Sequence, residues 1–321
     1  MNKEESINYL NELGENKTPC FFIIDYAMKE TLIWKTKEIP NTVLISFPSF
    51  TNCKKISIKN SITIDKNPFD YNSYKTAFDN VQKHLLRGNS FLVNLTAESS
   101  ITTNASINEM YHASKAPYTL AFKDDFIVFS PEPFIIIKKT KIQTFPMKGT
   151  INADLPKAKE TILTNKKEMA EHATIVDLLR NDLSIVANNV QVSNYRYIDT
   201  IKSKTDNLLH VSSCIEGEIK PDLQNKLGTI IFSMLPAGSI CGAPKHKTLS
   251  IIEEVESHIR GYYTGIMGYF DGENLESSVM IRFIQKKENN LYYKSGGGIT
   301  IQSNIDDEYN ELIQKIYVPT H

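Results

Sequence analysis

Strand-like segments in this chain of 321 residues follow one another directly, and they are not each followed by a helix. Four of them occupy Phe91–Thr96, Tyr118–Phe122, Phe126–Phe129 and Phe134–Lys138. Parallel strands need a long crossover between them, usually a helix, whereas antiparallel strands can be joined by short turns. The order of segments therefore predicts an α+β fold with largely antiparallel sheets, and it disfavours a doubly wound fold.

The other expected elements agree with this class. The first sixty or so residues have the pattern of short strands broken by polar turns. Further strands are expected at Cys20–Ala27, Thr42–Phe47, Gly261–Phe270, Ser277–Gln285 and Leu291–Ser295. Helices are expected at Tyr74–Arg87, Lys166–Leu183, Pro244–Glu256 and from Asp306 or Asp307 to Tyr317. Asn165 and Glu168 have the spacing of a capping box at the start of the second helix.

Composition argues against several classes of function. The formal net charge is −1, which provides no overall field for nucleic acid or a membrane surface. No run of about eighteen apolar residues occurs, and Met1–Ser6 lacks the apolar core of a signal peptide. We therefore expect a cytoplasmic protein that binds neither nucleic acid nor membrane. The four cysteines are scattered, and the common glycine motifs for nucleotides are absent, which argues against zinc, disulfide and nucleotide sites.

Lys148 is the first candidate catalytic residue. Pro146 precedes it by two positions and Gly149 follows it directly. Proline fixes φ and glycine permits close backbone approaches, so this amine is placed more narrowly than one on an open helix face. A lysine amine is a potential nucleophile. The alternative is a turn lysine in solvent, which is the usual position of lysine.

Two expected helices each carry a pair of glutamates three residues apart, Glu168 with Glu171 and Glu308 with Glu311. Residues at this spacing are neighbours on a helix surface. Four carboxylates facing one place would repel one another unless a divalent cation lay between them, and magnesium takes hard oxygen ligands. The alternative is two solvated faces, on which Glu168 caps its helix and Glu311 pairs with Lys315.

Three further features suit an anionic ligand. The triplet Gly296–Gly298, between strand-like runs, can turn bare N–H groups toward an anion, although a bulge or tight bend is the commoner case. The small-residue loop Gly238–Lys245 enters a helix whose N-terminal dipole suits a carboxylate. Arg282 interrupts an apolar strand, so it needs a buried partner or a place on a solvated edge. Together these residues predict a small substrate with carboxylates, a magnesium ion and a nearby lysine.

Long motifs of the chain also match a known family, in the family's order. They are Phe91–Thr96, Ser130–Glu132, Pro146–Thr150, Glu171–Leu183, Pro236–Lys245, Arg260–Gly265, Ile281–Arg282, Gly296–Gly298 and Glu308–Glu311. On these motifs the chain resembles the chorismate-utilising enzymes over about Asp65–Val318. The family includes aminodeoxychorismate, anthranilate, isochorismate and salicylate synthases. The resemblance implies a large α/β sandwich of two mainly antiparallel sheets with helices packed outside, and a magnesium-dependent reaction on chorismate.

The resemblance also implies roles for individual residues. The residues that would hold magnesium at the ring carboxylate are Glu171 and Glu311, with Glu168 and Glu308 beside them. The residues that would donate hydrogen bonds to the substrate are Gly149, Thr150, Gly296, Gly297 and Gly298. The residues that would surround the enolpyruvyl carboxylate are Tyr263 and Arg282, with Lys315 close by. His210 matches a family histidine near the substrate, and Glu132 matches the acid that would assist departure of the C4 hydroxyl.

Lys148 distinguishes branches within the family. The anthranilate, isochorismate and salicylate enzymes resemble one another in having alanine here, whereas lysine is typical of aminodeoxychorismate synthases. In those it resembles a nucleophile that adds at C2. Enzymes that add water at C2 have a lysine base where this chain has Leu92, so that base is missing. Leu92 also departs from the glutamine of the ammonia-using branches, as Cys241 departs from threonine and Pro133 from arginine in their motifs.

The resemblance therefore leads us to expect an aminodeoxychorismate synthase component I. Such an enzyme converts chorismate and ammonia to 4-amino-4-deoxychorismate for 4-aminobenzoate and folate, through a covalent lysine adduct. Because no glutaminase cysteine is evident, ammonia is expected from solution or from a glutamine amidotransferase subunit. The rivals are an anthranilate synthase component I and a chorismate-binding subunit without catalysis. Residues 1–64 are expected to form a short strand-rich region packed on a catalytic domain of residues 65–321.

Overall fold

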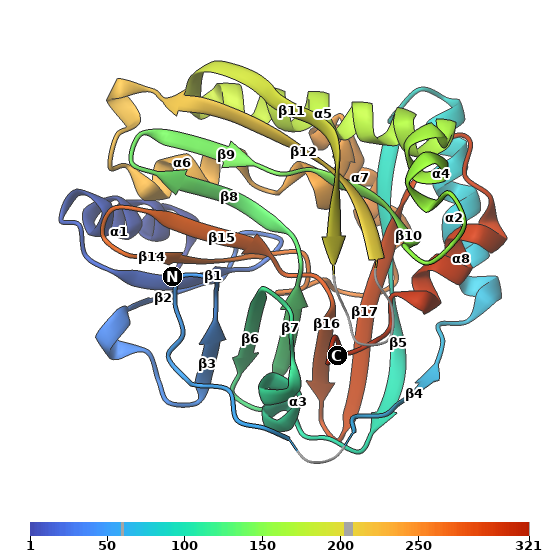
Figure 1. Ribbon diagram of the computed structural model, residues 1–321, viewed down its shortest axis with the longest axis horizontal. Coiled ribbons are helices and arrows are strands. Elements are labelled where there is room, and N and C mark those ends of the chain that lie inside the picture. Colours follow the sequence, from blue (N-terminus) through green and yellow to red (C-terminus); the bar gives the residue numbers. More distant parts are fainter. Residues whose placement is uncertain (59–60, 202–207, 321) are drawn as a thin grey trace.

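Two antiparallel β-sheets form the framework of the protein (Figure 1). The computed structural model describes residues 1–58, 61–201 and 208–320. Within these ranges every pair of neighbouring strands is antiparallel. The predicted α+β class with two mainly antiparallel sheets is confirmed.

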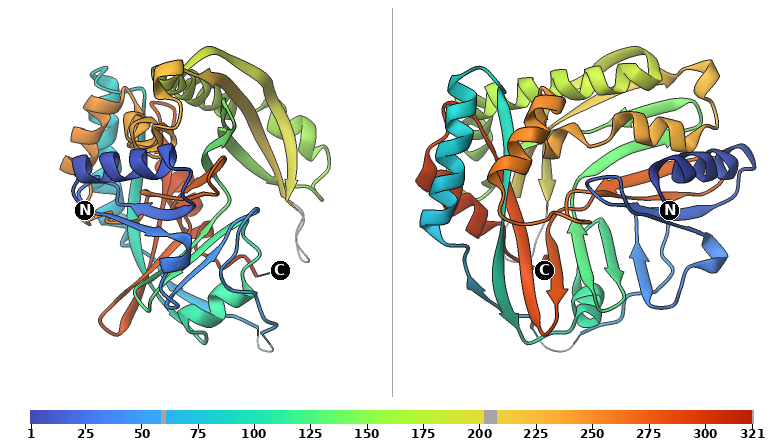
Figure 2. Two further views of the ribbon diagram at one scale, coloured as in Figure 1. Left: turned by 90° about the vertical axis from the view of Figure 1, so that its left-hand side faces the viewer. Right: turned by 180° about the vertical axis from the view of Figure 1, so that it is seen from behind.

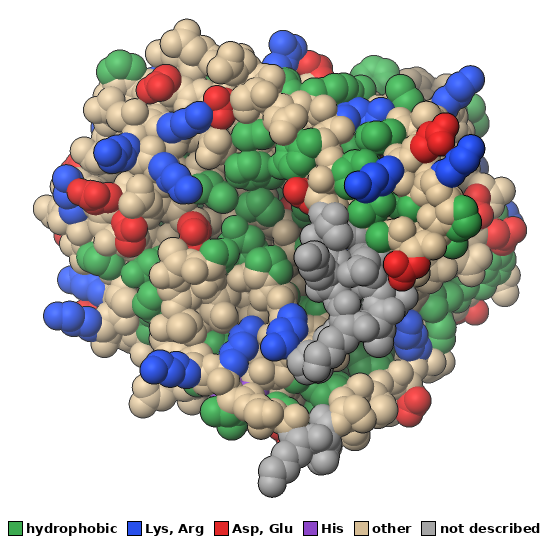
Figure 3. Space-filling model, in the orientation of Figure 1, with side chains coloured by type: hydrophobic (Ala, Val, Ile, Leu, Met, Phe, Trp, Pro, Cys, Tyr) green, Lys and Arg blue, Asp and Glu red, His purple; other side chains and the backbone are tan. Residues whose placement is uncertain are grey.

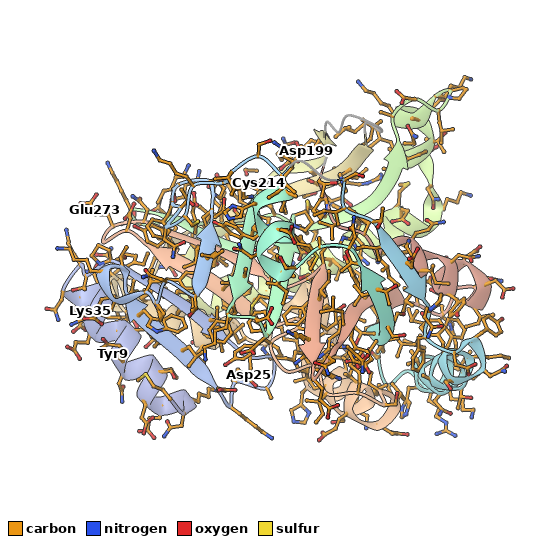
Figure 4. All side chains as sticks on the ribbon, turned by 90° about the horizontal axis from the view of Figure 1, so that it is seen from below. Tyr9, Asp25, Lys35, Asp199, Cys214 and Glu273 are labelled. Carbon is orange, nitrogen blue, oxygen red and sulfur yellow. The ribbon has the colours of Figure 1, made fainter. Side chains whose placement is uncertain are left out.

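The first sheet has the strand order β10-β12-β9-β8-β15-β14-β1-β2, and β11 also pairs with β12. Its strands are β1 (Cys20–Ile24), β2 (Thr31–Lys35), β8 (Pro133–Lys138), β9 (Lys141–Thr144), β10 (Met147–Asn152), β11 (Ala187–Ile201), β12 (Leu208–Ile219), β14 (Ile266–Phe270) and β15 (Leu275–Val279). Figure 4, seen from below, places the labelled Asp199 and Cys214 on the β11–β12 pair, away from Tyr9, Lys35 and Asp25 at the amino-terminal end of the molecule.

The second sheet has the strand order β13-β5-β17-β16-β7-β6-β3, and β4 also pairs with β5. Its strands are β3 (Val43–Ser46), β4 (Ile64–Asn67), β5 (Leu92–Thr103), β6 (Tyr118–Phe122), β7 (Phe126–Ser130), β13 (Gly242–Ala243), β16 (Phe283–Lys287) and β17 (Asn290–Ile299). Strands β1, β2 and β3 thus bring residues before position 64 into both sheets. The predicted domain boundary at that position stays a prediction.

Helices cover the outer faces of the sheets (Figures 1 and 2). They are α1 (Lys3–Glu15), α2 (Tyr71–Leu86), α3 (Ile107–Ala113), α4 (Ala158–Thr164), α5 (Lys166–Val186), α6 (Leu227–Met234), α7 (Lys245–Val255) and α8 (Ile305–Gln314). Helices α1, α5 and α6 share one apolar cluster with the first sheet, and α2, α7 and α8 pack on β5 and β17. None of the helices in the described ranges is both long and apolar enough to cross a bilayer.

The apolar run of β1 is buried on both sides. Phe22 and Ile24 join the cluster beneath the helices, while Phe21 and Ile23 join the cluster between the sheets. A strand covered on both faces needs apolar residues at every position, because alternate side chains point to opposite faces. This explains why the segment shows no alternation with polar residues.

The expectation of short strands at the amino terminus was wrong for residues 3–15, which form α1. The Asn2 side chain accepts a hydrogen bond from the Glu5 N–H, and the Glu5 carboxylate accepts one from the Asn2 N–H. These two bonds form a capping box, which fixes the start of the helix. The Asn-x-x-Glu spacing was therefore a usable signal in the sequence. Leu10 and Leu13 bury the inner face of the helix.

The strand predicted at Ser277–Gln285 is in fact two strands in different sheets. The chain leaves β15 in the first sheet after Val279 and enters β16 in the second sheet at Phe283. Arg282 lies at this crossing with a left-handed φ of 54°. Apolar periodicity did not reveal the break because both halves are buried. The Gly261–Phe270 segment likewise becomes a strand only from Ile266.

A second crossing lies beside the first. The chain passes from β7 in the second sheet to β8 in the first through Pro131 and Glu132. The Glu132 carbonyl accepts hydrogen bonds from the Val279 N–H at 3.1 Å and the Ser278 hydroxyl at 2.7 Å. These hydrogen bonds join the two crossings to each other. The crossings bring Glu132 and Arg282 to the boundary between the two sheets, which we call the seam.

Candidate active site

A cavity of about 790 Å³ lies at the seam between the sheets. Its wall combines residues of both crossings, strands β10, β12 and β17, and helices α5 and α8. The predicted site residues that line it are Glu132, Lys148, Gly149, Glu168, Glu171, His210, Tyr263, Arg282, Gly296, Gly297, Gly298, Glu308, Glu311 and Lys315. Thr150 lies in β10 opposite His210, and its side chain lies outside the described part of the structure. Residues scattered over about 180 positions of sequence thus meet in one place, while their roles stay predictions.

Lys148 is placed by an interrupted strand. Strands β9 and β10 pair with the same side of β12 in one continuous register, and Phe145 and Pro146 interrupt them. The register shifts at Gly149, whose φ of 77° is left-handed. A bulge of this kind re-aims the neighbouring side chain, and glycine adopts the conformation without strain. Lys148 precedes this bulge and projects into the cavity, as its proline and glycine neighbours suggested.

The Lys148 amine forms an ion pair across the cavity wall. Its Nζ lies 3.2 Å from Oε2 of Glu171, whose side chain is buried. Burial lowers the pKa of Lys148, but the charges of Glu171, Glu311 and Glu168 outweigh it, and the net pKa is raised. The raised pKa favours the ammonium form of this amine.

Glu132 lines the same cavity, and the shift of its pKa favours the neutral form of its carboxyl group. Burial raises the pKa of its carboxyl, against a hydrogen bond with Ser239 and the charges of Lys148 and Arg282. A carboxyl that keeps its proton toward neutral pH can act as a general acid. Ser239 belongs to the 3-10 turn η3 (Gly238–Ile240), in the small-residue loop that the sequence indicated. Its contact with Glu132 was not foreseen.

The glycine triplet lies inside a strand and is not a turn. Residues 296–298 of β17 pair with Thr96, Leu95 and Asn94 of β5. Pairing with β16 on the other side ends at Lys294, so the other edge of the triplet faces the cavity. A Cβ added at Gly298 would lie 2.9 Å from both Lys148 Nζ and Leu92 Cδ1. The absence of side chains lets Lys148 lie directly against the backbone.

The four glutamates come from two capped helices. Asn165 caps α5 through the Glu168 N–H, and Asn304 caps α8 through two N–H groups of its first turn. A Cβ at Gly297 would lie 3.4 Å from Glu308 Oε2 and 3.6 Å from Glu311 Oε1. A Cβ at Gly298 would lie 3.8 Å from Glu171 Oε2 of α5, so both helices direct carboxylates at the glycine strand.

The donor chemistry of these glutamates fits magnesium. Among the described residues, no group of three or more acidic, histidine or cysteine side chains is already gathered as a metal site. Glu171 and Glu311 instead pair with Lys148 and Lys315, the latter at 2.6 Å. Magnesium commonly binds through one or two carboxylates, with waters and substrate oxygens completing its shell. The glutamate oxygens of this site could serve as the protein ligands of magnesium. Waters and substrate oxygens would complete its coordination shell.

Arg282, His210 and Lys315 are further basic residues that line the cavity. The Arg282 guanidinium lies 5.2 Å from the centroid of the Tyr317 ring, and its Nε is buried without a hydrogen-bond partner in the described ranges. The sequence predicted a buried partner for the charge of Arg282, and the structure places the Tyr317 ring in that position. Burial and the Arg282 charge lower the pKa of His210, which favours the neutral imidazole. Burial lowers the pKa of Lys315 against the pull of Glu311, and its Nζ donates to the Gly296 carbonyl at 2.7 Å.

Several lining residues were not identified from the sequence. They are Asn94, Ser239, Lys294, Asp307, Asn310, Gln314 and Tyr317. Asn94 and Ser239 lie inside motifs that the sequence did single out. Asp307 lies four residues before Glu311 on α8 and Gln314 lies three residues after it, so helical spacing was the available signal for these two. Figure 3 shows acidic and basic side chains mixed over the face of the molecule that it presents.

Comparison with known proteins gives the family. Residues 28–321 match the family described as chorismate binding enzyme. An uncharacterized PabA-like protein of Haemophilus influenzae is 46% identical over 314 residues, which cover 98% of this chain and 96% of that protein. Aminodeoxychorismate synthase component 1 of Bacillus subtilis is 30% identical over 78% of this chain, and anthranilate synthase component 1 of Acetivibrio thermocellus is 32% identical over 88%. This chain spans about half of those two proteins, 55% and 56%.

The fold agrees with the family. The crystal structure titled as a putative 2,3-dihydroxybenzoate-specific isochorismate synthase from Bacillus anthracis superposes with a TM-score of 0.75. The alignment covers 98% of this chain and 87% of that one at 20% identity. Because the family match extends over most of the chain and through the cavity, the protein belongs to the chorismate-binding enzymes.

Proposed function

We propose that this protein is an aminodeoxychorismate synthase component I, which replaces the C4 hydroxyl of chorismate with an amino group. The observation that carries the proposal is the lysine amine of Lys148 in the same cavity as the protonatable carboxyl of Glu132. A nucleophile and an acid in one cavity suit a substitution in which a hydroxyl group must leave.

The reaction would proceed by two displacements. The Lys148 amine adds at C2, both ring double bonds shift by one position, and the C4–oxygen bond breaks as Glu132 donates a proton, so that water leaves. Ammonia then adds at C4, both double bonds shift back, and the C2–nitrogen bond to Lys148 breaks. Glu132 takes back the proton that ammonia loses. The covalent step replaces one difficult substitution with two easier ones.

Lys148 must be deprotonated before it can act as a nucleophile. Its amine is charged while Glu171 and Glu311 lie beside it, so it must lose a proton before it attacks. Magnesium held by Glu171 and Glu311, with Glu168 and Glu308 beside them, would neutralise these carboxylates and fix the ring carboxylate. Leu92 presents an apolar side chain beside the amine, which lowers the solvation of its charged form.

Positive and donor groups would hold the rest of the substrate. Arg282 has an unpaired Nε at the cavity, and Tyr263 lies beside it. These two groups suit the enolpyruvyl carboxylate, because arginine binds carboxylates through charge-assisted hydrogen bonds. The exposed edge of Gly296–Gly298 and the bulge at Gly149 would supply backbone donors.

Ammonia would come from solution or from a separate glutamine amidotransferase subunit. Burial raises the pKa of Cys20 to about 12 and that of Cys241 to about 11, so neither thiol is available as a thiolate nucleophile. Because the sequence has no evident glutaminase cysteine, glutamine alone is not expected to support the reaction.

Anthranilate synthase is the second candidate, because the Acetivibrio enzyme of that name is 32% identical to this chain. The test is a product assay with the purified chain, chorismate, ammonium and magnesium, read by mass spectrometry. A product that keeps the enolpyruvyl group and gains nitrogen at C4 is expected. Direct formation of anthranilate would overturn the proposal. Tight binding of chorismate without turnover by the folded protein would instead indicate a binding subunit.

A further inference from the structure

Lys294 is a buried lysine at the cavity that the proposed reaction does not use. It lies in β17, two residues before the glycine triplet, and its side chain is only 1% exposed. Burying an ammonium group is costly unless it is paired and hydrogen-bonded. Its contacts are therefore informative about what holds it in place.

The Lys294 amine binds the backbone of the segment that carries Tyr263. Its Nζ donates to the carbonyl oxygens of Ile259 at 2.9 Å and Arg260 at 3.0 Å. The same Arg260 carbonyl accepts the N–H of Tyr263 at 3.1 Å, which closes the turn that presents this tyrosine. One carbonyl thus joins the lysine to the tyrosine.

A second contact reaches the tyrosine ring. Lys294 Nζ lies 5.8 Å from the centroid of the Phe283 ring, and that ring lies 5.9 Å from the ring of Tyr263. Tyr263 is therefore supported on its backbone and on its ring by groups that Lys294 contacts. Methionine could fill a similar volume but could not donate to the two carbonyls.

The charge of Lys294 is balanced mainly by Glu98. Glu98 lies 3.8 Å from its Nζ and also pairs with Lys287 at 2.6 Å. Burial lowers the pKa of Lys294 to about 8, and Glu98 opposes this shift. The Arg260 side chain is held independently, since Glu256 and the carbonyls of Ile240 and Asn94 accept its hydrogen bonds.

We infer that Lys294 is a positioning residue that fixes the Arg260–Tyr263 turn, so that Tyr263 meets the carboxylate of the substrate. The inference rests on the proposed function for the role of Tyr263. Its effect is expected mainly in substrate affinity, because Lys294 itself touches backbone oxygens and no reacting atom.

A double-mutant cycle tests this role, with Lys294→Met, Tyr263→Phe and the double variant. Chorismate affinity is measured by calorimetry, which needs no turnover, and KM and kcat are measured alongside. We expect Lys294→Met to weaken binding about tenfold with a smaller change in kcat. In the Tyr263→Phe background the same change should have little further effect, because residues that act through one another are not additive.

Lys287→Met is the matched control, since it also removes a lysine from Glu98 but lies at the surface. It should keep wild-type affinity. Additive effects of Lys294→Met and Tyr263→Phe, or wild-type affinity in Lys294→Met, would overturn the inference. If Lys294→Met does not fold, Lys294→Gln, which keeps a donor, takes its place. Failure of both to fold would show a structural role only. The product that the wild-type protein forms tests the proposed function, separately from the test of Lys294.

Discussion

Lys148 Nζ lies 3.2 Å from Oε2 of Glu171, across the wall of a cavity that also contains Glu132. The lysine comes from an interrupted strand of the first sheet, and the glutamate comes from helix α5. The pair joins a proposed nucleophile to a proposed metal ligand. A ligand that binds the Glu171 carboxylate would therefore change the charge beside the Lys148 amine, and with it the protonation of that amine.

Lys148→Ala should keep the fold and chorismate binding but lose most turnover, at least a hundredfold in kcat. The amine is the group proposed to attack C2, whereas the groups proposed to hold the carboxylates remain. Steady-state kinetics and intact-mass spectrometry check this, and the wild type should show a chorismate-derived adduct on Lys148. Lys166→Ala is the control, because Lys166 is exposed at the start of α5. Wild-type rates in Lys148→Ala would remove the nucleophile role.

Two glycine substitutions in β17 should affect different properties, one the activity and the other the stability. At Gly298 an added Cβ meets the flexible ends of Lys148 and Leu92, so Gly298→Ala should fold but lose about a hundredfold in kcat as the amine is displaced. At Gly296 the added Cβ would lie 2.6 Å from the Leu95 carbonyl oxygen, which cannot move freely. Gly296→Ala should therefore lower the melting temperature. Thermal melts and kinetics on both variants separate the cases, and equal stability losses would contradict the assignment.

Magnesium should stabilise the protein in the presence of chorismate, because a ligand that binds only the folded state raises its melting temperature. Chelation with EDTA should remove both the stabilisation and the activity. Glu311→Gln should raise the magnesium concentration at half effect by at least tenfold. Glu160→Gln on the exposed side of α4 should not. A melting temperature that is insensitive to magnesium in the wild type would count against the metal.

Asp182 should give a pH dependence to stability. Its carboxyl lies 2.7 Å from Lys245 Nζ, yet burial raises its pKa to about 6. The folded state then binds the proton more tightly than the unfolded state, so this residue destabilises the fold as pH rises from about 4 to about 6. Relative to Asp182→Asn, the wild type should lose on the order of 3 kcal/mol of unfolding free energy over this interval. Urea unfolding at several pH values measures it, and parallel curves for the two proteins would show that Asp182 does not titrate there.

Local patterns in the sequence predicted the elements with the clearest periodicity. The α5 helix and its Asn165 cap appeared as expected, and β6 has the predicted bounds Tyr118–Phe122. The segment at Ser277–Gln285 was predicted as one strand, because a periodicity of two residues does not show when a strand changes sheets. The α1 helix was missed although its capping box was present.

The sequence by itself determined the antiparallel class, the family and the residue types of the cavity, because these follow from short-range patterns and long motifs. Only the tertiary structure decided which atoms meet. Glu132 and Arg282 come together because two strand crossings lie side by side, and Lys148 reaches Glu171 because a bulge and a helix face one glycine strand. Such contacts depend on how distant segments pack, and residue spacing along the chain does not encode that packing.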